Sequence, residues 1–152
     1  MQKDKKKLLK KIKWQLFLLG KVKIPMLGYT GLKLIDINDT KVIAQIKLKR
    51  KTKNHLNSMY FGALAVGADV AAGIHAFYFA NVYEKKVSFA FKGMSCEFIK
   101  RAESDCMFIS EDGKKVEDAI LESIETGDRV NTTTEVKAYD KENDLVATFE
   151  MI

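Results

Sequence analysis

The segment from Asn54 to Gly73 holds the residues whose types and spacing could do chemistry. Polar residues lead into an expected helix with Gly62 in its first turn, and Asp69 follows seven residues later on the same helix face. The first N–H groups of a helix lack intrahelical acceptors and lie at the positive end of its dipole. They could bind the developing oxyanion of a thioester, and glycine lets a substrate approach the backbone. The segment therefore suits acyl transfer, with Asp69 attacking directly or activating water.

This segment resembles a motif of PaaI-type hotdog-fold thioesterases, N-x-x-G-x-x-H-G-G-x-x-x-x-x-x-D, over residues 54–69. The resemblance extends over residues 24–152, but only this segment is specific. Asn54, Gly62 and Asp69 match the motif asparagine, the second glycine of the pair and the helix aspartate. By resemblance, Asp69 is the base or nucleophile, and the Gly62 N–H polarises the thioester carbonyl. Asn54 orients the carbonyl or the water.

The same resemblance implies an acyl-CoA thioesterase that forms a homodimer or a dimer of dimers. Its active sites would lie at the subunit interface. Coenzyme A enters only as part of the thioester substrate, so no cofactor is expected. The chain has no P-loop or dinucleotide-binding motif, and its two histidines and two cysteines lack the closed four-ligand set of a structural zinc site. No metal is expected either.

Three positions depart from the motif: Tyr60 replaces its histidine, Phe61 replaces its first glycine, and Asn57 replaces its loop glycine. A bulky Phe61 side chain narrows the space for the acyl group. A non-catalytic hotdog module that binds acyl-CoA or an acyl chain is therefore the alternative function. His55, Ser58, Tyr60 and Phe61 precede or open the helix and are the expected substrate-binding residues, although Ser58 also suits the N-cap.

The formal charge of +6 is concentrated at the N-terminus. Residues 1–23 carry nine lysines and one aspartate, whereas residues 24–152 carry a net charge of −2. A nearly neutral body makes a nucleic-acid partner unexpected. We predict two parts: a basic amphipathic helix within residues 1–23 and a hotdog domain over residues 24–152.

The expected N-terminal helix, residues 3–19, has an apolar stripe on one face and lysines on the others. It is either a surface helix packed on the body with solvated lysines, or a helix that contacts an acidic membrane surface or an acyl carrier protein. Cys96 and Cys106 are expected to be reduced and buried in strands. The predicted location is therefore cytoplasmic, at the periphery of a membrane if the helix binds one.

The surrounding elements predict an α+β fold. Residues 29–37 and 41–48 alternate apolar and polar side chains and form a hairpin, and residues 59–79 form a helix that is apolar nearly all round. That helix resembles a membrane span, but Asp69 near its centre favours a buried core helix. Further strands are expected over residues 87–91, 96–98, 106–108, 132–139 and 145–151, with a helix over residues 114–126. This order matches an antiparallel hotdog sheet wrapped around one long central helix, with an extra N-terminal helix.

Overall fold

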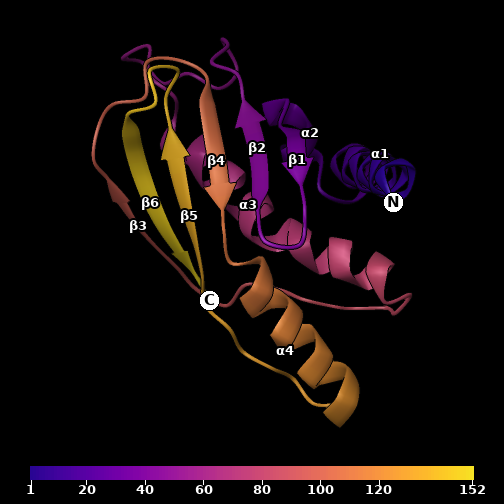
Figure 1. Ribbon diagram of the computed structural model, residues 1–152. Coiled ribbons are helices and arrows are strands. Elements are labelled where there is room, and N and C mark those ends of the chain that lie inside the picture. Colours follow the sequence, from indigo (N-terminus) through magenta and orange to yellow (C-terminus); the bar gives the residue numbers. More distant parts are fainter.

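An antiparallel six-stranded sheet curves around one long helix, α3 (Phe61–Val82), in a computed structural model that describes residues 1–152 (Figure 1). The strand order is β1-β2-β4-β5-β6-β3. The strands are β1 (Lys33–Ile37), β2 (Val42–Ile46), β3 (Met94–Phe98), β4 (Cys106–Ser110), β5 (Thr134–Tyr139) and β6 (Leu145–Met151). The other helices are α1 (Gln2–Leu18), the π-helical turn η1 (Leu19–Lys23), α2 (Pro25–Thr30) and α4 (Gly113–Thr126). The predicted hotdog architecture with an added N-terminal helix is confirmed.

Helix α3 is the core element because it is apolar nearly all round and the sheet covers most of it. It is long and apolar enough to cross a bilayer, but 72% of its most apolar stretch is buried in the domain. Gly67 permits the closest approach: a Cβ there would lie 2.3 Å from the ring of Phe108, a fully buried residue of β4. The expected core helix is confirmed, and α3 is not a clear membrane span.

Helix α1 packs on the body through its apolar stripe. Ile12 and Leu16 are buried in the same core as the sheet, and the side-chain amide of Asn81 in α3 donates to Gln15 at 2.9 Å. Helix α1 also lies against β1, the strand at one end of the sheet. The helix therefore covers the β1 edge, while its other faces remain exposed.

The start of the predicted hairpin is wrong by four residues. Pro25 opens the short helix α2, since proline has no N–H to lose at a first helical position. Gly31, with φ of +71°, ends the helix in the left-handed conformation that glycine adopts without strain. Strand β1 therefore starts at Lys33, not at residue 29.

The strand expected over residues 87–91 is also wrong, because that segment packs across α3 instead of pairing with a strand. A Cβ on Gly73 would lie 2.8 Å from the ring of Phe89, and the Phe77 and Phe89 ring centroids are 5.8 Å apart. An extended segment that packs one side against the core shows the same alternation of apolar and polar side chains as a β-strand.

Burial of the two thiols also differs from the expectation. Cys106 is buried in β4, as predicted, but Cys96 is exposed. The difference arises because β3 is the last strand of the sheet and nothing lies beyond it.

Because the Phe108 ring packs directly on Gly67, adding a single methyl group at position 67 should destabilise the protein. Gly67→Ala should lower the free energy of unfolding by about 1–3 kcal/mol through overpacking, although alanine is favoured over glycine in helices by about 1 kcal/mol. Urea denaturation measures this change. The double variant Gly67→Ala/Phe108→Leu should be less destabilised than the sum of its two single variants. A Gly67→Ala protein as stable as the wild type would contradict the packing described.

Candidate active site

The N-terminus of α3 presents two free backbone donors. Tyr60 is the N-cap residue and makes no side-chain capping bond, and its carbonyl accepts the N–H groups of Ala63 and Leu64 at 2.9 and 3.2 Å. The N–H groups of Phe61 and Gly62 donate to no backbone or side-chain acceptor. They lie at the positive end of a 22-residue helix, where a negatively charged oxygen is stabilised.

Asp69 lies two turns further along the strip of α3 that the sheet leaves open. The half-buried residues of this strip include Gly62, Ala65, Val66 and Asp69. No hydrogen bond or ion pair involves the Asp69 carboxylate, and desolvation by burial is the only cause that raises its pKa. A partly buried carboxylate without a partner costs stability, so it is a candidate for chemistry.

Asn54 organises the loop that leads into α3. Its side-chain oxygen accepts the N–H groups of Leu56 at 2.9 Å and Ser58 at 3.1 Å, which leaves its amide nitrogen without a bond. Asn57 in the same loop has a φ of +60°. This is the left-handed region, which glycine adopts most readily and asparagine adopts far more readily than most other residues. The departure of Asn57 from the motif therefore keeps the loop conformation.

Two aromatic rings frame the first turn of α3. The Tyr60 ring lies over Gly62, so that a Cβ on this glycine would be 2.4 Å from the ring. The Tyr60 and Phe61 centroids are 4.8 Å apart, and Phe61 reaches Phe98 of β3 at 6.3 Å. Both Tyr60 and Phe61 are about half exposed. The start of α3 therefore lies beside the free β3 edge of the sheet.

The remaining candidates have different surroundings. His55 is exposed in the loop. Ser58 is buried, its hydroxyl has no hydrogen-bond partner, and it is not the N-cap, because the helix begins only after Tyr60. His75 is fully buried, with Nε2 2.9 Å from the Asn38 carbonyl oxygen, and burial lowers its pKa. His75 is therefore a core residue.

The structure thus brings Gly62, Tyr60 and Phe61 together at one end of α3, with Asn54 in the adjoining loop. Asp69 stays apart, two turns along the helix. Sequence reasoning missed Phe98, which adjoins Phe61. No local signal could have identified it, because its position depends on β3 pairing with β6 at the end of the sheet.

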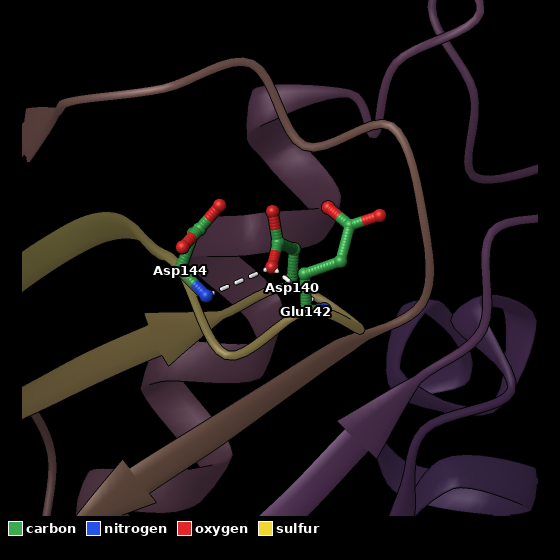
Figure 2. A group of neighbouring side chains, drawn as sticks. All are labelled: Asp140, Glu142 and Asp144. Atoms are coloured by element: carbon green, nitrogen blue, oxygen red, sulfur yellow. Dashed lines mark hydrogen bonds between the residues drawn. The ribbon is translucent and has the colours of Figure 1, made fainter.

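An acidic group in the β5–β6 turn is the other place where a cation could bind. The carboxylates of Asp140, Glu142 and Asp144 lie within 4.8 Å of one another (Figure 2). Asp140 accepts the N–H groups of Glu142 and Asp144, and Lys100 Nζ lies 2.9 Å from Asp140 and 2.6 Å from Asp144. The lysine lowers the pKa of Asp140. Lys100 therefore already supplies the positive charge in this turn.

Solved structures with the same fold include thioesterases. A protein of unknown function from Chlorobaculum tepidum has a TM-score of 0.81 and 15% identity over 97% of this chain and 93% of its own. Zebra fish thioesterase superfamily member 2 has a TM-score of 0.67 and 12% identity over 94% of each chain. A thioesterase from Haemophilus influenzae has a TM-score of 0.59 and 8% identity over 83% of this chain and 78% of its own. At these identities the likeness shows a shared hotdog fold.

No curated protein matches the sequence. One family model does match, over residues 13–152, and its description is "Domain of unknown function (DUF4442)". The match covers the sheet, α3 and the candidate site. The chain therefore belongs to the DUF4442 family, and its structural neighbours include proteins of the thioesterase superfamily.

Proposed function

We propose that this protein hydrolyses acyl-CoA thioesters at sites formed between two copies of the chain. One observation carries the proposal: the same open strip of α3 holds the free N–H groups of Phe61 and Gly62 and, two turns along, the unpartnered carboxylate of Asp69. Thioesterases among the structural neighbours support the same reaction class.

The reaction follows from these groups. The thioester carbonyl oxygen accepts the N–H groups of Phe61 and Gly62, which stabilise the oxyanion as it forms. Ionised Asp69 takes a proton from water while the water oxygen bonds to the carbonyl carbon. The tetrahedral intermediate then expels the coenzyme A thiolate, and Asp69 returns the proton to it. The free amide nitrogen of Asn54 is suited to orient the carbonyl or the water.

The two groups come from different copies of the chain. Seven residues of helix separate Gly62 from Asp69 by about 10 Å along the axis, whereas a catalytic group must lie within about 3 Å of the atom it serves. One thioester therefore fits more readily between Gly62 of one copy and Asp69 of a second. The contact of Phe61 with Phe98 supports this arrangement, because it brings the oxyanion donors to the sheet edge where a second copy would dock.

The β3 edge supports a dimer. Met94, Cys96 and Phe98 each pair across from a buried β6 residue and so face the core side of the sheet. Yet all of β3 is exposed, with Met94 at 41% and Phe98 at 49%. An exposed apolar edge strand is a template for pairing with another chain. Two copies joined at β3 would cover these side chains and continue the sheet.

The basic segment that precedes the Asn54 loop suits the phosphates of coenzyme A. Lys49, Arg50, Lys51 and Lys53 precede the Asn54 loop, and none of them forms an ion pair, so they can bind phosphates. Only Lys51 has a partner, the Tyr29 ring, at 5.1 Å from its centroid. The exposed rings of Tyr60 and Phe61 offer apolar surface to the acyl group. A cytoplasmic location fits this substrate and the reduced thiols.

The second candidate is a module that binds acyl-CoA without hydrolysis. Its supporting observation is the Tyr60 ring over Gly62, which occupies space that a substrate would need for close approach. Tight binding of acyl-CoA without thiol release would favour this alternative.

Substitution of Asp69 tests the reaction. Against a panel of short, long and aromatic acyl-CoAs, Asp69→Asn should release free thiol about 100-fold or more slowly than the wild type. In the wild type, kcat/KM should rise with pH through the pKa of Asp69, which burial raises above the ordinary aspartate value of about 3.9. Equal rates for the two proteins, or no turnover across the panel, would contradict the mechanism.

Thermal unfolding of the same variant controls for misfolding. The raised pKa means that the folded state binds the Asp69 proton more tightly than the unfolded state, so this group costs stability as pH rises past about 3.9. Asp69→Asn removes that cost. Its Tm should therefore match or exceed that of the wild type at neutral pH, and this gain should vanish below the ordinary aspartate pKa.

A charge on the inner side of β3 tests the dimer. Cys96→Asp should convert the dimer to a monomer in sedimentation equilibrium and abolish hydrolysis, because it would bury a charge in the new interface. Ser95→Asp is the matched control, since its side chain points to the opposite face of the same strand. It should stay dimeric. A wild type that is monomeric, or a dimer that tolerates Cys96→Asp, would refute pairing at β3.

A further inference from the structure

The outer face of α1 combines lysines with aromatic side chains. Residues at alternating steps of four and three fall on one side of a helix. Ile12 and Leu16 fix the inner side because they are buried in the core. The opposite side carries one exposed line of five residues, and Lys21 of the adjoining η1 turn extends it. These six residues are here called the outward stripe: Lys3, Lys7, Lys10, Trp14, Phe17 and Lys21.

The two aromatic residues of the outward stripe form an exposed apolar ridge. Trp14 and Phe17 are 59% and 52% exposed, and their rings stack with centroids 5.6 Å apart. Lys21 Nζ lies 5.8 Å from the Phe17 centroid, so a cation flanks the ridge. Neither ring belongs to the core, so packing of the domain does not account for them. Other large apolar side chains exposed nearby are Leu18, Val22, Ile24, Met26 and Tyr29.

The lysines of this region have no acidic partners. None of the nine lysines in residues 1–23 forms an ion pair, and the only ion pair there joins the N-terminal amine to Asp4. The positive charge is therefore unneutralised within the chain. An anionic surface outside the chain would neutralise this charge.

From these observations we propose that the outward stripe binds the surface of a membrane that contains anionic lipids. Aromatic rings among lysines suit the boundary between headgroups and acyl chains, where the apolar body is buried and cations meet lipid phosphates. A second copy of the chain is a poor occupant, because two lysine-rich faces repel each other. An acidic protein would satisfy the charges but gives no reason for an exposed ridge that includes the only tryptophan of the chain.

The placement of α1 leaves this surface free in the proposed dimer. Helices α1 and α2 lie together at the β1 end of the sheet, whereas β3 forms the other end (Figure 1). Membrane binding therefore does not compete with pairing at β3. It also does not depend on hydrolysis, so each proposal can fail without the other.

Trp14 reports on the contact directly, because its emission shifts to the blue on entering an apolar phase. The full chain is titrated with vesicles of phosphatidylcholine alone and with vesicles containing 30% phosphatidylglycerol, and bound protein is measured by co-sedimentation. We expect a blue shift and co-sedimentation only with the anionic vesicles. Both should fall steeply at 0.5 M salt, where the Debye length is only about 4 Å.

Two matched sets of lysine substitutions locate the surface. Replacing Lys3, Lys7, Lys10 and Lys21 with glutamine should weaken partitioning by about 100-fold or more. Replacing Lys85, Lys86, Lys92 and Lys141, which are equally exposed and unpaired, should change it less than about 3-fold. Phe17→Ser keeps the tryptophan reporter and should weaken partitioning by about 10-fold.

Three outcomes would overturn the proposal. The first is wild-type protein that neither co-sediments nor shifts its emission. The second is binding that the two lysine sets weaken equally. The third is binding to acyl carrier protein, tested in parallel as an acidic soluble probe, with no binding to anionic vesicles.

Discussion

The structure depends on the need to cover a helix that is apolar nearly all round. Helix α3 has 22 residues, and a single curved sheet can wrap most of its circumference but not all of it. The strip left open carries Asp69, the one carboxylate of the helix. Its position at the margin of the core explains both the desolvation that raises its pKa and its lack of a partner within the chain.

The two edges of the sheet differ in what covers them. At the β1 edge, α1 packs its apolar stripe on the body and keeps the positive charge of residues 1–23 on its outer side. At the β3 edge no element follows, and inward-facing side chains remain exposed beside the start of α3. One end of the domain is thus suited to a second copy of the chain, while the other is suited to an anionic surface.

Much of this arrangement could be predicted from the sequence where one strong local signal dominates. The continuous apolar run predicts α3, and the spacing of Gly62 and Asp69 places both on one face. Weaker local patterns predict the wrong structure at two places. The six residues of α2 make fewer than two helical turns, which is too short to show a helical repeat, so the alternation from residue 29 onward favours a strand. Alternation over residues 87–91 reflects packing across α3 rather than pairing.

Other features depend on tertiary order and have no local signal. The exposure of Cys96 follows from the position of β3 at the end of the sheet, which the sequence alone does not specify. The N-cap falls on Tyr60 rather than Ser58 because the Asn54 loop holds the backbone of Ser58. Conversely, the left-handed Asn57 shows how a departure from the motif can preserve the loop.

The most direct test of a site shared between subunits is hydrolysis by mixed dimers of two inactive variants. Asp69→Asn lacks the base, and Phe61→Pro lacks one oxyanion donor at the first helical position, where proline is tolerated because the backbone of Tyr60 before it is extended. Each variant alone should be inactive. Random mixing should restore about a quarter of wild-type activity, because each mixed dimer holds one intact site. Mixed dimers that form but stay inactive would contradict the shared site.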